Sequence, residues 1–105
     1  MNPGSVANDF TGVVTGFLNR IKDDPRIGPT HICLFIAIAH LASEQKFDEP
    51  ISVFSKNLMR SAKISGIATY HKCMQDLQTI GFINYVPSYN PLLGSLIYLR
   101  KPEKE

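Results

Sequence analysis

The sequence predicts an α+β fold that is mainly helical, with a small antiparallel β-sheet near its C-terminal end. Apolar residues recur with the three-and-four spacing of helices in several segments before residue 81. Two β-prone runs follow, residues 82–86 and 96–99, and the loop between them is rich in turn-forming residues. A length of 105 residues and a hydrophobic share of 44% allow one ordinary globular core. We therefore expect a single domain over residues 1–105.

The first predicted element is an amphipathic helix over residues 5–24. Its apolar positions keep helical spacing for about four turns, and they are Val6, Phe10, Val13, Val14, Phe17, Leu18 and Ile21. Gly12 and Gly16 weaken such a helix by roughly 1 kcal/mol each relative to alanine, so it needs a partner surface. Asp23-Asp24-Pro25 ends it, because a residue before a proline avoids the helical region. The partner surface belongs either to the rest of this chain or to a second copy, which makes the helix a candidate dimer contact.

A second helix is predicted from Gly28-Pro29-Thr30 onwards, since proline suits the first helical position. Residues 31–45 carry no formally charged side chain before Glu44, and apolar residues cover nearly the whole circumference. Such a helix must be covered on most sides, and about fifteen residues are too few to span a bilayer. We expect it to be the central core helix. The two cysteines, Cys33 and Cys73, lie within apolar helical patterns and are expected to be reduced and largely buried.

Residues 55–83 are predicted to form two helices joined by a tight turn and followed by a strand. Ser55 is a good N-cap residue for the first helix. Its inward residues are expected to be Leu58, Met59 and Ala62. Residues 63–66 interrupt the periodicity, and the second helix then places an apolar face inward, formed by Tyr70, Met74 and Leu77. Gly81 stands where a left-handed C-terminal cap is usual.

This register, with Gly66 followed by the three inward residues and closed by Ile80-Gly81-Phe82-Ile83, resembles the winged-helix DNA-binding domains of small bacterial regulators. The resemblance covers roughly residues 30–101. A weaker likeness is to the small winged-helix proteins of mobile genetic elements. The resemblance implies a winged helix-turn-helix core over residues 28–101, preceded by the extra N-terminal helix. It also implies that residues 51–54 form a short strand against the C-terminal hairpin, whose loop, residues 87–94, is the wing.

The resemblance further implies sequence-specific binding of double-stranded DNA by a small transcriptional regulator. The second helix of the pair, about residues 66–80, would lie in the major groove, and the preceding helix would lie against the phosphate backbone. Polar and small residues on its outer face would meet base edges, and the basic residues would meet phosphates. The expected DNA contacts are Lys56, Arg60, Lys63, Ser65, Ile67, Ala68, Thr69, His71, Lys72 and Gln75. As a homodimer, the protein would present two such helices about 34 Å apart.

The distribution of charge favours this interpretation more than its amount. A formal net charge of +2 is too small to indicate a nucleic-acid binder by itself. Between Ser55 and Gln75, however, there are four basic residues and no acid, whereas acids gather at residues 23–24 and 48–49. The simpler alternative for the basic residues is a solvated helix face.

The predicted wing departs from the pattern of winged-helix regulators, because residues 87–94 contain no Lys or Arg. Leu92 and Leu93 in this loop motivate a competing hypothesis, in which the winged helix serves protein–protein association. A further alternative is an accessory DNA-binding protein of a mobile element. The three hypotheses share one fold. Protein association would use the wing, whereas regulation and the accessory role would both use the helix-turn-helix and are not separated by the sequence.

Catalysis, cofactors and membrane insertion find little support in the sequence. It has no glycine-rich phosphate loop, no paired histidines at metal-ligand spacing and no closely spaced cysteine pair. It also lacks a basic segment followed by a long apolar run, and no stretch of about 18 residues is uniformly apolar. We expect a cytoplasmic protein that is not an enzyme, binds no metal or cofactor and does not enter a membrane.

Overall fold

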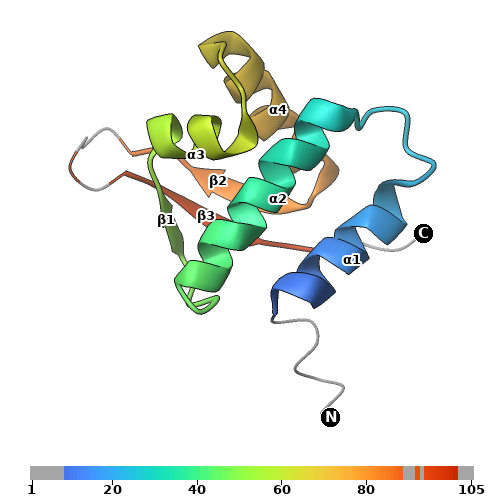
Figure 1. The fold of residues 1–105 in the computed structure, drawn as a ribbon, viewed down its shortest axis with the longest axis horizontal. Coiled ribbons are helices and arrows are strands. Elements are labelled where there is room, and N and C mark those ends of the chain that lie inside the picture. The colour runs from blue at the N-terminus through green and yellow to red at the C-terminus, as the bar shows by residue number, and fades with distance from the viewer. Residues whose placement is uncertain (1–8, 89–91, 93, 102–105) are drawn as a thin grey trace.

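The computed structural model describes residues 9–88, 92 and 94–101. Within them the chain forms an α+β fold of four helices and a three-stranded antiparallel sheet (Figure 1). The elements in chain order are α1 (Phe10–Ile21), α2 (Pro29–Glu44), β1 (Ile51–Val53), α3 (Ser55–Ala62), α4 (Ile67–Ile80), β2 (Ile83–Val86) and β3 (Ser95–Leu99). The α+β class predicted from the sequence is therefore confirmed.

Helix α2 is the centre of the fold, as its apolar circumference predicts. In Figure 1 it crosses one face of the sheet, with α1 on one flank and α3 and α4 on the other, and it contacts all three helices. Leu34, Ile38 and Ala39 on α2 are fully buried. One prediction for this helix is wrong, since Cys33 is exposed while Cys73 is buried. Periodicity could not decide the side of Cys33, because the whole helix is apolar.

The sheet has the strand order β1-β3-β2, so the last strand lies in the middle. Ile97 at its centre is fully buried and faces Ile51 on one neighbour and Tyr85 on the other. The expected pairing of residues 51–54 with the hairpin is confirmed, although β1 ends at Val53.

Helix α1 is shorter than predicted. Ser5 and Val6 lie outside the described residues, and within these the helix begins after Asp9, whose carboxylate accepts a hydrogen bond from the Gly12 N–H at 2.7 Å. It packs on α2 through aromatic rings, since Phe17 stacks on Phe35 with ring centroids 3.9 Å apart. Most of the amphipathic pattern is thus satisfied within the chain itself.

The ends of α3 and α4 show which cap predictions are right. Ser55 is already the first residue of α3, and the extended Phe54 is its N-cap, so the predicted Ser55 cap is wrong by one residue. The reason is that the Phe54 carbonyl accepts the first helical hydrogen bond, from the Leu58 N–H at 3.0 Å. Gly81 caps α4 in the left-handed conformation, with φ 107°, as predicted.

Candidate nucleic-acid interface

The orientation of α4 is determined by the burial of one apolar face. Tyr70, Met74 and Leu77 are at most 1% exposed, which confirms their predicted inward direction. Burying side chains of this size contributes about 1.5–3 kcal/mol each, so rotating the helix would be costly. On the preceding helix, Leu58 and Ala62 are buried and Met59 is partly buried against the core.

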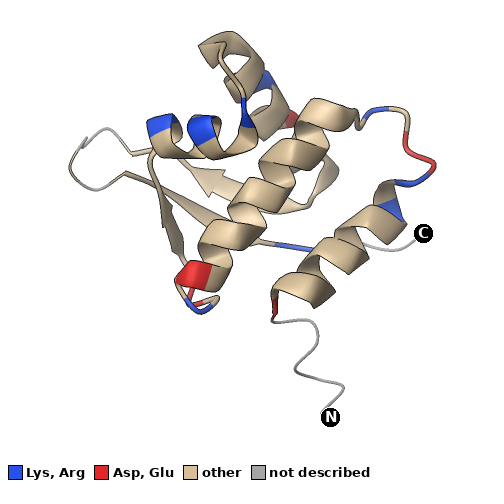
Figure 2. Ribbon diagram, viewed as in Figure 1, with Lys and Arg blue, Asp and Glu red and all other residues tan. Residues whose placement is uncertain are grey.

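The opposite face of α4 is open to solvent, together with the outer side of α3 and the turn between them. Every residue predicted to contact DNA is exposed: Lys56, Arg60, Lys63, Ser65, Ile67, Ala68, Thr69, His71, Lys72 and Gln75. We call this surface the α3–α4 face. Figure 2 shows blue segments along α3, at the turn and on α4, while most acidic segments lie at the far ends of the molecule. The structure therefore places the predicted residues, all of them exposed, on two consecutive helices and the turn between them.

One of these residues, Lys72, is engaged in an ion pair that the sequence did not suggest. Its ammonium nitrogen lies 3.1 Å from Oδ2 of Asp76, one turn further along α4. The Lys72 side chain is 76% exposed, and exposed pairs at this spacing contribute only about 0.3–0.5 kcal/mol. Lys72 could therefore leave Asp76 and pair with a phosphate oxygen at little cost in free energy.

Asp76 also contacts the start of α2 through a histidine. His31 Nδ1 accepts a hydrogen bond from the Gly28 N–H at 3.0 Å, and its Nε2 lies 2.8 Å from Asp76 Oδ2. Because Nδ1 accepts, the ring proton belongs on Nε2, which donates it to the carboxylate. Hydrogen bonds from His31 and Lys72 lower the pKa of Asp76. We call this set of contacts the His31–Asp76 link; it holds α4 against the beginning of α2.

A shallow hollow of about 220 Å³ lies where α2 and α4 meet at this link. The first turn of α2 lines it together with Thr69, Lys72 and Asp76, so a cation and a carboxylate border the same space. The start of α2 is not among the residues that the sequence predicts to contact DNA. Only the local order Gly28-Pro29-Thr30-His31 signalled a helix start there, and its position beside α4 depends on the tertiary fold.

The hairpin loop is described only in part. Of the residues singled out in the predicted wing, Leu93 lies outside the described residues, and Leu92 is 85% exposed. Gly94 anchors the loop, because it has φ +68° and a side chain there would place Cβ 2.6 Å from the Val53 carbonyl oxygen. The apolar residues Phe54 and Val86 are also exposed near this end of the sheet.

Two other features, a metal-ligand group and a membrane-spanning helix, were sought in the part of the chain that the structure covers. Among residues 9–88, 92 and 94–101, no group of three or more His, Cys, Asp or Glu side chains is arranged to hold a metal ion. None of the helices in the same residues is long and apolar enough to cross a membrane.

No protein-family model matches the chain, and comparisons with curated proteins and with solved structures found no match. What this protein does must therefore be inferred from the geometry and chemistry of its own surfaces.

Proposed function

We propose that this protein binds double-stranded DNA sequence-specifically as a small transcriptional regulator. In this proposal α3 and α4 act as a helix-turn-helix, and the β2–β3 hairpin is the wing of a winged helix. One observation carries the proposal: α4 buries Tyr70, Met74 and Leu77 while its opposite face lies open beside a basic helix. An exposed helix with flanking cations is the arrangement by which such motifs enter the major groove.

Sequence would be read by the outer side chains of α4. Thr69, His71 and Gln75 can donate hydrogen bonds to base edges or accept them from base edges. Ile67, which is 53% exposed, and Ala68 offer apolar contact to the methyl group of thymine. Exposed apolar residues at the start of α4 are unfavourable in water, and a contact of this kind would cover them.

Affinity would come mainly from phosphate contacts. Lys56, Arg60 and Lys63 lie on α3 and the turn, where a helix-turn-helix meets the backbone. Ser65 and the first N–H groups of α4 also suit a phosphate. Each phosphate contact releases counterions, so the logarithm of the binding constant should fall with that of salt concentration by about 0.9 per contact.

A homodimer would double this small contact surface. Helix α1 lies on the flank of α2 away from α3 and α4 (Figure 1), so a contact there would leave the α3–α4 face free. Its Leu18 is 39% exposed. Light scattering on the whole chain and on a chain lacking residues 1–24 tests this: a dimer that becomes a folded monomer supports the contact, and an unchanged monomeric mass refutes it.

The DNA-binding proposal is tested by fluorescence anisotropy with labelled duplexes across a salt series. We expect Arg60→Ala and Lys72→Ala each to weaken binding and to lower the salt dependence by about one unit of slope. Lys22→Ala is the matched control, because it removes an exposed cation at the end of α1, outside the α3–α4 face. Absence of binding at low salt, or indifference to both substitutions, would refute the proposal.

The second candidate function is protein association through the hairpin loop. The exposed Leu92, with Val86 and Phe54 exposed near the same end of the sheet, favours it. A partner retained by the wild type and lost with Leu92→Asp, together with negligible DNA affinity, would support this alternative. An accessory role in a mobile element would use the α3–α4 face, so a footprint over host and element DNA would distinguish it from regulation.

A further inference from the structure

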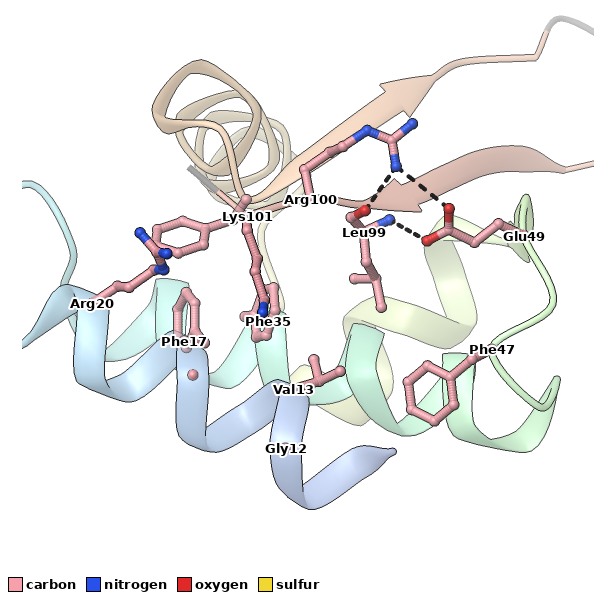
Figure 3. A pocket seen from close by; sticks show the side chains of 12 residues that line it. Gly12, Val13, Phe17, Arg20, Phe35, Phe47, Glu49, Leu99, Arg100 and Lys101 are labelled. Carbon is pink, nitrogen blue, oxygen red and sulfur yellow. Dashed lines mark hydrogen bonds and ion pairs between the residues drawn. The ribbon is translucent and has the colours of Figure 1, made fainter. Parts of the chain in front are cut away.

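A second feature of the molecule lies on the side away from α3 and α4. It is a cleft of about 430 Å³ between α1, the middle of α2, the connector after α2 and the end of β3 (Figure 3). Its apolar lining includes Val13, Phe47 and Leu99, which the fold leaves only partly buried. The stacked rings of Phe17 and Phe35 form the wall behind them. The volume lies within the range of about 300–1,000 Å³ that is usual for small-molecule sites.

Two local features of the backbone border this cleft. Gly12 and Gly16 line it from α1, and a Cβ added at Gly16 would meet nothing within 4 Å. Alanine would fit there and would favour the helix by about 1 kcal/mol, so glycine at this position leaves space at a cost in stability. On the other side, Lys46 and Phe47 both have positive φ values, 58° and 56°. A positive φ costs a residue other than glycine about 1–3 kcal/mol. One of these two strained residues, Phe47, places its phenyl ring in the lining of the cleft.

The polar part of the lining is mainly cationic. The described residues that line it include three cations, Arg20, Arg100 and Lys101, and one acid, Glu49. Glu49 is occupied within the fold, since it accepts a hydrogen bond from the Leu99 N–H at 2.7 Å and pairs with Arg100 at 3.4 Å. In Figure 3 the Lys101 side chain runs down toward Phe35, so its ammonium group lies over the apolar part of the cleft. The described lining thus combines apolar side chains with more cationic than anionic groups.

We propose that this cleft binds a small organic anion, namely a carboxylate or sulfonate on an apolar body of about two to three aromatic rings. The rings would lie against Val13, Phe47 and Leu99. The anionic group would meet Lys101, with Arg20 on the same rim. A cation beside apolar surface attracts an anion more strongly than it does in open water. The proposal does not depend on DNA binding, because it uses none of the residues of the α3–α4 face.

The test uses two probes that share the same aromatic body. 1-Anilinonaphthalene-8-sulfonate carries the anion, and N-phenyl-1-naphthylamine is its uncharged counterpart. Fluorescence titration of the full chain should show one site per chain, with the sulfonate bound at least about tenfold more tightly, because charged hydrogen bonds are the stronger ones. Equal affinity for the two probes would overturn the assignment of the anionic group.

Variants then locate the site. Gly16→Leu should fill the cleft and weaken both probes by about tenfold or more, whereas Gly16→Ala should weaken them less. Lys101→Met should remove the preference for the sulfonate and leave the uncharged probe unaffected. Lys56→Gln is the matched control, since it removes the same charge from α3 and should change neither affinity.

Near-ultraviolet circular dichroism accompanies each titration, because the sulfonate probe also binds partly unfolded chains. Unchanged affinities in a natively folded Gly16→Leu variant would overturn the proposal, and so would an unchanged sulfonate preference in Lys101→Met. If a second copy of the chain filled the cleft instead, probe affinity would fall as protein concentration rises, which would also overturn it. If the probes bind as expected but the DNA assay shows no binding, only the proposed DNA binding is refuted.

Discussion

His31 on α2 donates to Asp76 on α4 across 2.8 Å, although the two residues are 45 positions apart in the chain. The same histidine accepts the Gly28 N–H, so one ring joins the start of α2 to the middle of α4. Helix α4 is therefore held by apolar burial on one face and by this polar contact at its side.

Replacing His31 by alanine should destabilise the protein by about 1–2 kcal/mol, because it removes two hydrogen bonds and leaves the Gly28 N–H without its acceptor. His40→Ala is the matched control on the same helix, since His40 is exposed and lies 4.0 Å from an equally exposed Glu44. Urea denaturation of both variants measures the difference. Equal losses in the two variants would show that the link adds nothing to stability.

The link also makes stability depend on pH in the acid range. The pKa of Asp76 is lowered in the folded state by hydrogen bonds from His31 and Lys72. A folded pKa below the unfolded one stabilises the protein above the unfolded value, near 3.9, and this stabilisation disappears as pH falls through the folded pKa. Asp76→Asn should therefore lose less stability than the wild type between about pH 5 and pH 2. Asp48→Asn, an exposed control, should follow the wild-type profile.

Tyr70 has a buried hydroxyl for which the described residues provide no hydrogen-bond partner, and burial raises the pKa of its phenol. Phenylalanine would keep the ring and remove the unpaired group. We expect Tyr70→Phe to leave the free energy of unfolding unchanged or to raise it by up to about 1 kcal/mol. Tyr70→Ala should cost about 3–5 kcal/mol by opening a cavity. A clear loss of stability in Tyr70→Phe would mean that the hydroxyl is paired.

Two glycines should respond in opposite directions to the same substitution. Gly94→Ala should destabilise the protein by about 1–3 kcal/mol, because φ is positive and Cβ would meet the Val53 carbonyl oxygen. Gly16→Ala should stabilise it by about 0.5–1 kcal/mol, since Cβ enters open space on a helix. Thermal unfolding of the pair provides the measurement. A loss of stability with Gly16→Ala would contradict the open cleft beside α1.

Local sequence patterns predicted most of the helices and strands of the fold. The spacing of Tyr70, Met74 and Leu77 predicted the face that α4 buries, and Gly81 predicted its end, because both depend on neighbours within one helix. The exposed side of Cys33 was missed, since an all-apolar helix has no polar face to orient it. The predicted N-cap of α3 was wrong by one residue. The side-chain preference of serine favoured Ser55 as the cap, whereas the helix already begins at Ser55 and Phe54 is the cap.

The sites were predictable to different degrees for the same reason. The exposed residues of α4 in the α3–α4 face follow from one helical register, so the sequence alone predicts which of its side chains point outward. The His31–Asp76 link joins elements 45 residues apart, and the cleft collects residues from both ends of the chain. No spacing rule brings Gly16, Phe47 and Lys101 together, because they meet only where α1, the connector after α2 and the residues after β3 come together in the fold.

The central position of β3 has a consequence for the order in which the chain folds. Ile51 pairs with Ile97, which is synthesised 46 residues later. Strand β1 therefore has no partner strand while α3, α4 and β2 are being synthesised. The helices close in sequence can assemble first, because their contacts are local and form quickly. The sheet is then completed last, when β3 inserts between two strands that have no hydrogen bonds to each other.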